Sequence, residues 1–448
     1  MLEPEFDLVI RCSRALIDGE IRPAEIGISN GRIVAVDSWP LHGYRSVTLD
    51  ADEILIPGLV DSHVHFNEPG RANWEGFESG TRAAAAGGVT TIVDMPLSSV
   101  PATTSIHALE AKRYAALDSS VIDVGIWGGA VPENLGTLRE LHEAGVFGFA
   151  ALLLPSGVDD YGFLDGDQLD RALEEVASFG GLLTIHAEDP ALFSSEDDGG
   201  RSYESYLGCH PASAEVAAIE RVIAGVRRTG CRAHILHLTS ADALPALRAA
   251  RAEGLPITVE TCPHYLTFDE SQIPDGATQF KCTPPIRSAA DREALWQGLL
   301  DGDIDIVVSD HDPSTVELKF GDQGDFALAT PGISGLQVGL SAVWTEAARR
   351  EIPLARVVEW MSSGPAAILG LGRKGRIAVG ADADLVAFAP DEGFTVRAAH
   401  LQHRNQLTAF EGLELEGVVH RTWLRGQEVD IAIRALPHGQ VLDARDLA

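Results

Sequence analysis

The chain has 448 residues, 45% of them hydrophobic and 22% charged, which is enough for one large domain and a smaller one. Acidic residues outnumber basic ones by 66 to 34, so the net charge is −32. Nucleic acids and anionic membranes attract positive faces, and this balance therefore argues against both as partners. No apolar run reaches the roughly 20 residues of a membrane span, and the first residues do not resemble a signal peptide. Five scattered cysteines without a C-x-x-C pair are typical of reduced thiols, so a cytoplasmic location is expected.

Both ends of the chain are predicted to be rich in β-structure. Residues 6–55 contain short apolar runs, two of which flank Asn30-Gly31, a strong hairpin signal. Beyond residue 374 the pattern returns, with two short strands expected in 374–388 and a hairpin around 418–426. The first region is too short to bury a core alone. Because chain ends often lie close together, residues 1–55 and 375–448 are predicted to form one small split β-sandwich domain.

Between these ends, residues 56–374 alternate between strand and helix patterns. Helical patterns cover 76–86, 104–117, 166–179, 211–228, 241–252 and 289–300, and strand patterns cover 55–65, 89–95, 121–128, 146–154, 182–188, 233–239, 256–262 and 304–310. Such alternation favours a parallel sheet with helices on its faces, and the count of eight predicts an α/β (β/α)₈ TIM barrel. A doubly wound open sheet is the alternative, but no glycine-rich phosphate fingerprint follows the first strand.

Histidines and one aspartate stand where these strands end. His63 and His65 are two residues apart on the first strand, so both imidazoles project to one side. His186 ends the fifth strand, His237 the sixth and Asp310 the eighth. In a barrel, the carboxyl ends of the strands carry the active site. Imidazoles with a carboxylate and no thiolate suit Zn²⁺ or a similar divalent ion. By contrast, His234 would point to the other face of its strand and have a supporting or structural role.

A series of motifs places the chain near a known family. In order they are Asp61–Arg71 with Trp74–Phe77, Ala86–Thr91, Asp94–Leu97, Trp127–Gly129, His186–Glu188, Cys262–Leu266, Lys281–Arg287 and Gly332–Gln337. With them, the chain resembles the cyclic amidohydrolases of the amidohydrolase superfamily, which include dihydroorotases and hydantoinases, and it is most similar to allantoinases. The resemblance extends from Asp7 to about Val429. It implies a metal-dependent hydrolase of purine catabolism that opens a cyclic ureide, most directly allantoin to allantoate. A hydantoinase- or dihydropyrimidinase-type activity on another cyclic amide is the alternative.

The resemblance also implies roles for single residues. His63, His65 and Asp310 would hold one metal, and His186 and His237 would hold a second. Asp310 would be the catalytic residue, a general base that later acts as an acid. Relatives are commonly homotetramers or homodimers, so a homo-oligomer is expected.

Contacts with the substrate are implied around the mouth of the barrel, at Asn67, Arg71, Ser98, Cys282, Asp312 and Ser334. Two of these depart from allantoinases, because Ser98 replaces the usual asparagine and Asp312 the usual serine. Arg71 could instead pair within its loop. A carboxylate at Asp312 would repel a ring that carries a carboxylate, which makes dihydroorotate the least favoured substrate.

A further departure affects the metal ligands directly. Relatives carry on the fourth strand an N-carboxylated lysine that bridges two metals, and alignment puts Ala150 at that position. No lysine occurs between Lys112 and Lys281, so a shifted residue cannot replace it. One metal on His63, His65 and Asp310 is therefore favoured over two.

Three other hypotheses remain at this point. In the first, Asp312 or Glu188 supplies a compensating carboxylate to the metal centre. In the second, the chain is a non-catalytic relative, impaired by Ala150, that kept the fold. In the third, Ala150 was introduced deliberately to trap an inactive form.

Overall fold

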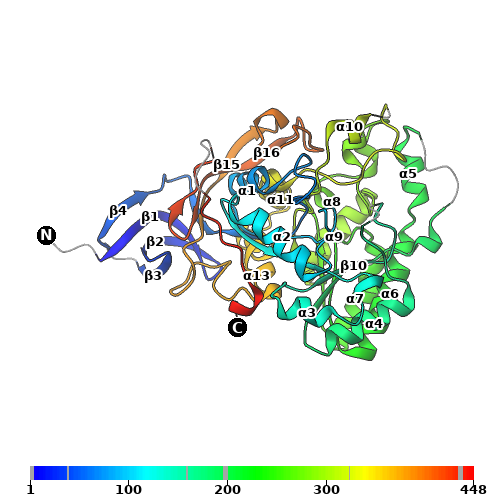
Figure 1. Cartoon of the computed structure of the whole chain (residues 1–448). Coiled ribbons are helices and arrows are strands. Elements are labelled where there is room, and N and C mark those ends of the chain that lie inside the picture. Colours follow the sequence, from blue (N-terminus) through cyan, green and yellow to red (C-terminus); the bar gives the residue numbers. More distant parts are fainter. Residues whose placement is uncertain are drawn as a thin grey trace.

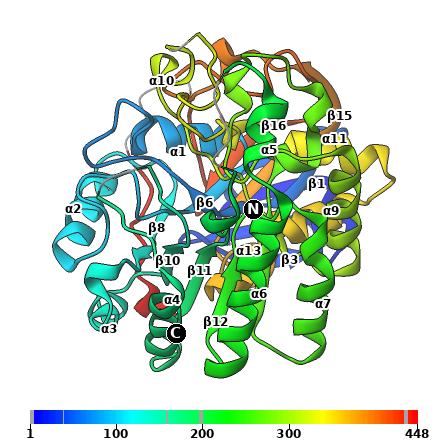
Figure 2. The same ribbon diagram turned by 90° about the vertical axis from the view of Figure 1, so that its right-hand side faces the viewer.

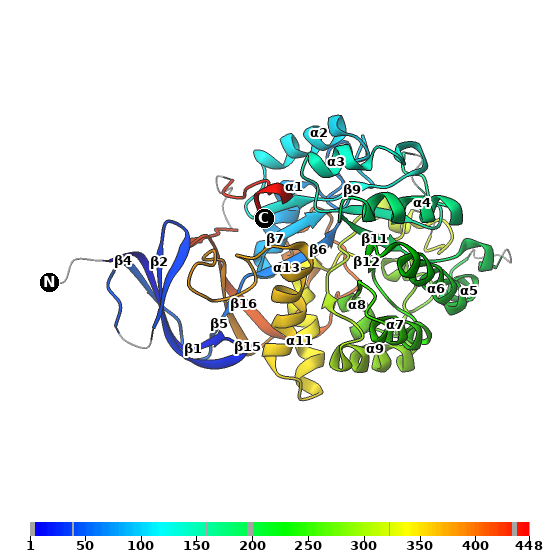
Figure 3. The same ribbon diagram turned by 90° about the horizontal axis from the view of Figure 1, so that it is seen from below.

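The computed structural model describes residues 5–37, 40–157, 160–194, 200–321, 323–431 and 437–447. Figure 1 shows the N-terminal strands projecting to one side of a larger body, in which helices surround strands. The view from below in Figure 3 shows the same separation. In the described part of the chain, no helix is both long and apolar enough to cross a membrane.

The strands of the larger body are parallel and form two sheets. One sheet has the order β6-β7-β8, and the other has the order β14-β13-β12-β11-β10-β9. Their bounds are β6 Leu59–Val64, β7 Val89–Asp94, β8 Asp123–Ile126, β9 Gly128–Gly129, β10 Phe149–Leu152, β11 Leu182–His186, β12 Arg232–Ile235, β13 Ile257–Thr261 and β14 Ile306–Val307. Each of the eight regions expected to be a strand contains one, so the α/β class is confirmed. Among the described strands, hydrogen bonding gives two sheets and not one closed barrel.

Two contacts link the edges of these sheets. Only Trp127 separates β8 from β9, and the backbone N–H of Phe147, just before β10, donates to the carbonyl oxygen of Ile126 at the end of β8 at 3.1 Å. At the opposite edges, Val64 and His311 form an isolated parallel bridge. The carboxyl end of β6 therefore lies beside the segment that follows β14, which is where the predicted site residues stand.

Helices pack around these strands, as Figure 2 shows. Their bounds are α1 Phe77–Ala86, α2 Ile106–Leu117, α3 Leu138–Glu143, α4 Gly166–Ala177, α5 Tyr203–Cys209, α6 Ala212–Thr229, α7 Leu244–Ala252, α8 Pro263–Thr267, α9 Ala289–Asp301, α10 Val316–Phe320, α11 Gly339–Arg349, α12 Leu354–Val358 and α13 Gly364–Leu369. The sequence of α4 shows why such segments are helical. Asp165 caps its first turn by accepting from the backbone N–H of Gln168, and Leu169, Leu173 and Val176 form one buried stripe.

Strands from both chain ends share one sheet of eight strands. Its order is β17-β16-β15-β5-β1-β2-β3, with β4 paired to β1. The bounds are β1 Phe6–Ile17, β2 Glu20–Ser29, β3 Arg32–Asp37, β4 Gly43–Thr48, β5 Ile54–Pro57, β15 Leu385–Thr395, β16 Glu414–Leu424 and β17 Gln427–Glu428. The hairpin at Asn30-Gly31 is confirmed, with φ angles of 51° and 74°. The two chain ends associate, as predicted, and together they form one hydrogen-bonded sheet. The predicted sandwich of two facing sheets is not seen among the described strands.

Two of the expected strands differ from the structure. The run 55–65 divides at Gly58 into β5 and β6, which belong to different sheets. A Cβ at Gly58 would lie 2.2 Å from the Thr90 hydroxyl, so a glycine is needed where the chain passes between the sheets. The segment 374–388 was expected to hold two strands, but only β15 forms, from Leu385 onward. Before it, the chain makes only an isolated bridge between Asp382 and Arg32, and Lys374 is buried against the carboxylates of Asp123 and Asp384.

Candidate metal centre and active site

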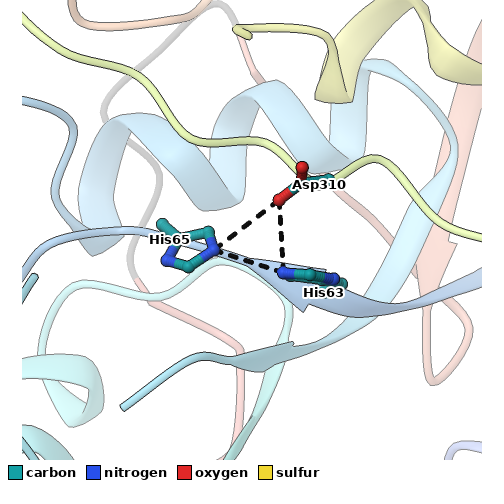
Figure 4. Close-up of side chains that lie close together, drawn as sticks. All are labelled: His63, His65 and Asp310. Atoms are coloured by element: carbon teal, nitrogen blue, oxygen red, sulfur yellow. Dashed lines mark hydrogen bonds and ion pairs between the residues drawn. The ribbon is translucent and has the colours of Figure 1, made fainter. Parts of the chain in front are cut away.

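Three buried side chains converge where β6 meets the segment after β14 (Figure 4). The Nε2 atoms of His63 and His65 are 3.3 Å apart. Asp310 Oδ1 lies 3.2 Å from His63 Nε2 and 3.6 Å from His65 Nε2. For metal bonds of about 2.0–2.1 Å, the corners of a tetrahedron lie about 3.3–3.4 Å apart. The three atoms therefore fit one face of a tetrahedral zinc-like site, with the fourth corner free for water or substrate.

Backbone contacts hold these three residues together. The Asp61 carboxylate accepts from the backbone N–H groups of His63 and Ser309, each at 3.1 Å. This carboxylate thus ties β6 to the residue before Asp310. Asp310 itself has a φ of 45°, in the left-handed region that few side chains adopt, which is typical of functional sites.

Asp310 and His63 shift the pKa of each other. Burial disfavours the ionised form of Asp310, but the nearby His63 and His65 outweigh it and hold the pKa of this carboxyl well below its usual range. Burial likewise disfavours charged His63, but Asp310 and Glu260 outweigh it and raise the pKa of its imidazole to about 9. A metal ion needs the neutral imidazole, so metal binding is expected to release a proton.

The second histidine pair is arranged differently. The rings of His186 and His237 meet edge to face with centroids 4.5 Å apart. The Nε2 of His186 shares a 2.8 Å hydrogen bond with the buried Glu188 carboxylate. Burial lowers the pKa of His186 to about 3 and that of His237 well below its usual range, so both are neutral. Among the described residues, neither belongs to a group of three potential ligands whose donor atoms lie close together.

Ala150 lies on β10 in the wall of the same cavity as both histidine pairs. The cavity has a volume of about 140 Å³ and is lined further by Met95, Leu97, Leu152, Leu154, Pro155, Ser156, Leu236, Cys282, Thr283, Asp310, Asp312, Pro331 and Gly332. The methyl group of Ala150 offers no donor atom beside His186 and His237. Among the described residues that line this cavity, His186 and His237 are therefore the two side chains left for a second ion.

Neither Glu188 nor Asp312, the two carboxylates that could have compensated for the missing lysine, belongs to the metal trio. Glu188 is engaged with His186, and Asp312 lines the cavity without belonging to the group of three ligands. Burial raises the pKa of both carboxyls, that of Glu188 to about 7.

A second group of potential ligands, formed by Cys262, His264 and Asp310, was not expected. It shares Asp310 with the trio, but neither Cys262 nor His264 lines the cavity. Burial, reinforced by the Asp310 charge, also raises the pKa of the Cys262 thiol well above its usual value. The trio of His63, His65 and Asp310 is therefore the better metal site.

The substrate contacts suggested by the resemblance divide into two sets. Cys282 and Asp312 line the cavity. The remaining four, Asn67, Arg71, Ser98 and Ser334, lie outside its wall. The guanidinium of Arg71 donates to the Ser98 carbonyl oxygen at 2.9 Å and lies over the Trp74 ring, so it has partners within its own loop region.

Sequence reasoning missed Glu260, which lies in the buried strand β13. Its Oε1 is 2.6 Å from His63 Nδ1, and its Oε2 is 2.9 Å from His234 Nε2. Burial opposes its charge, but His63 and His234 outweigh it and lower the pKa of Glu260 to about 2. A glutamate inside a segment predicted to be a buried strand is a signal that could have found it. The expected supporting role of His234 agrees with this contact.

Comparisons with known proteins agree with this fold and site. The profile of the Amidohydrolase family matches residues 54–429. An allantoinase of Streptomyces avermitilis is 52% identical over 95% of this chain and 96% of its own length. An allantoinase of Saccharomyces cerevisiae is 41% identical over 97% and 99%. The solved structure of L-hydantoinase (dihydropyrimidinase) from Arthrobacter aurescens superposes with a TM-score of 0.89, at 30% identity, over 98% of this chain and 97% of that one.

Parallel strands enclosed by helices, with imidazoles and a carboxylate gathered at the strand ends, define a metal-dependent hydrolase. The chain belongs to the amidohydrolase family, and within it to the cyclic amidohydrolases, with allantoinases among its relatives.

Proposed function

We propose that this enzyme hydrolyses the ring amide of allantoin to give allantoate. The observation that carries the proposal is the trio of His63, His65 and Asp310, set at tetrahedral spacing in the wall of a cavity of about 140 Å³. Curated relatives that share 52%, 41% and 40% of their residues with this chain are allantoinases. The hydantoinase structures are 25–30% identical, so hydrolysis of another cyclic amide is not favoured.

His63, His65 and Asp310 would hold the metal, which we infer to be one zinc ion per chain. When bound, such an ion acts as a Lewis acid and lowers the pKa of water near it. The ionised Asp310 is placed to accept the proton of the attacking water. The water oxygen bonds to the ring carbonyl carbon, the C–N bond breaks, and Asp310 returns the proton to the leaving nitrogen.

Other residues that line the cavity would contact the substrate or exclude water. Neutral His186 and His237 line the cavity and can hydrogen-bond to the substrate. Apolar side chains such as Met95 and Leu97 limit the access of bulk water. The Asp312 carboxylate favours the N–H groups of a neutral ureide over a carboxylate-bearing ring.

We further propose a division into a barrel over residues 56–374 and a small domain formed by 1–55 and 375–448. In support, Ile10, Leu55, Leu385 and Trp423 belong to one buried cluster that joins the two chain ends. The parallel strands of the larger body are proposed to act as one (β/α)₈ barrel, given the bridge between Val64 and His311. We also propose that the enzyme is a cytoplasmic homotetramer or homodimer that acts in purine catabolism.

The test is allantoin ring opening by the zinc-supplemented protein, run beside its Ala150→Lys variant. Turnover by the unmodified chain, with one zinc per chain by metal analysis, is the expected result. Activity that appears only in Ala150→Lys would mean that the chain is disabled at this position. Absence of turnover in both proteins, or turnover of hydantoin alone, would overturn the assignment of allantoin as the substrate.

A further inference from the structure

Glu260 connects the two histidine pairs of the cavity. One carboxylate oxygen, Oε1, lies 2.6 Å from His63 Nδ1 and also accepts from the backbone N–H of His237 at 3.2 Å. The other oxygen, Oε2, lies 2.9 Å from His234 Nε2, whose Nδ1 is 2.7 Å from the Thr258 hydroxyl. The side chain of Glu260 is 1% exposed, so water cannot take the place of these partners. Three segments of the site therefore meet at one carboxylate.

We propose that Glu260 is a positioning residue that orients His63 as a metal ligand and holds the backbone of His237 in its unusual conformation. This inference rests on the proposed metal site. An ionised carboxylate can only accept hydrogen bonds, so the contact places the imidazole proton of His63 on Nδ1. In the neutral imidazole that binds a metal, Nε2 then carries the free lone pair, and it is the atom that faces His65 and Asp310. Carboxylates that bind the far nitrogen of a metal-ligating histidine fix its tautomer and make it more basic.

The second part of the role concerns His237. This residue follows the end of β12 and has a φ of 35°, which lies in the left-handed region and is strained for a residue with a side chain. The hydrogen bond to Glu260 offsets that strain. Because one oxygen serves both His63 and His237, a change at Glu260 displaces the His63 ring and the backbone of His237 together.

The experiment compares two buried glutamates. Glu260→Gln keeps the size of the side chain but removes its charge, and Glu260→Asp keeps the charge but shortens the reach. Glu215→Gln is the matched control, since Glu215 is equally buried and accepts from the backbone N–H groups of Thr239 and Ser240 but contacts none of the proposed metal ligands. Zinc affinity is measured for each full-length protein by competition with a chelating dye, and folding is followed by circular dichroism.

We expect zinc affinity to fall about 10–100-fold in Glu260→Gln and to fall measurably in Glu260→Asp. Glu215→Gln should lose thermal stability but keep wild-type zinc affinity. Wild-type affinity in a folded Glu260 variant would overturn the proposal, and so would an equal loss in Glu215→Gln. If the wild-type protein binds zinc without hydrolysing allantoin, the proposed function fails while the zinc titration still decides the role of Glu260.

Discussion

Asp310 Oδ1 lies 3.2 Å from His63 Nε2, although these residues belong to opposite ends of the segment that forms the larger body. The bridge between Val64 and His311 brings their strand ends together. The Asp61 carboxylate also holds the two segments together, because it accepts from the backbone N–H groups of His63 and Ser309. The pairing of the first and last parallel segments is therefore what creates the metal site, and the first prediction concerns Asp310.

Replacing Asp310 with asparagine should abolish most of the activity while leaving the fold intact. Asparagine retains an oxygen that can approach a metal, but it cannot accept and return a proton. General acid–base catalysis contributes about 10²–10⁴-fold, and kcat for allantoin should fall by that factor. Steady-state kinetics with zinc present provide the measurement. Asp301→Asn, on the half-exposed end of α9, is the control, and an unchanged kcat in Asp310→Asn would contradict the proposed base.

Asp312 should control the response to rings that carry a carboxylate. Two like charges about 4 Å apart repel by roughly 1–4 kcal/mol, depending on the local dielectric. Asp312→Ser should therefore strengthen inhibition of allantoin hydrolysis by dihydroorotate about tenfold or more. The inhibition constant is measured for the wild type, for Asp312→Ser and for the isosteric Asp312→Asn. Equal constants in all three would show that this carboxylate does not discriminate between substrates.

Lys374 should be essential for stability, at a distance from the cavity. Its Nζ lies 2.6 Å from both Asp123 Oδ2 and Asp384 Oδ2, and its side chain is 5% exposed. Lys374→Met removes the cation that pairs with buried Asp384, while Asp123 keeps its ion pair with Arg425, and breaking a buried pair typically costs about 3–5 kcal/mol. Urea denaturation checks this value. The matched control, Arg227→Met, removes an exposed pair with Glu253 and should change the midpoint little. A comparable midpoint shift in both variants would refute the role of the buried network.

His420 should make stability depend on pH. Its ring nitrogens lie 2.9 Å from Glu53 Oε1 and 2.8 Å from Glu392 Oε2. Partial burial disfavours the charged ring, but these hydrogen bonds outweigh it and raise the pKa of His420 above its ordinary value. Because the pKa is higher in the folded state, the stabilisation is complete below the unfolded value of about 6.5 and is lost as pH rises through the folded value.

Thermal unfolding of the wild type and of His420→Gln tests this dependence. The ring is partly exposed, so solvent screening limits the contribution to about 1 kcal/mol or less. The difference in Tm should be larger near pH 6 than near pH 9, at which the imidazole is neutral. A difference that grows with pH would contradict the assignment.

The sequence by itself determined the elements and most of the metal trio. Apolar runs separated by amphipathic helices indicate buried parallel strands, and alternation along a strand places His63 and His65 on one side. Local patterns of this kind depend only on neighbouring residues. Asn30-Gly31 is a hairpin for the same reason, since both residues tolerate a positive φ.

Only the tertiary structure decided which distant groups share a carboxylate or a sheet. Glu260 on β13 lies 2.6 Å from His63 on β6, although 197 positions separate them in the sequence, and neither local sequence reveals that proximity. Lys374 lies among buried aspartates from β8 and from the segment before β15, a contact that the residue pattern of 374–388 does not reveal. These contacts join residues far apart along the chain, and packing of the whole fold brings them within hydrogen-bond distance.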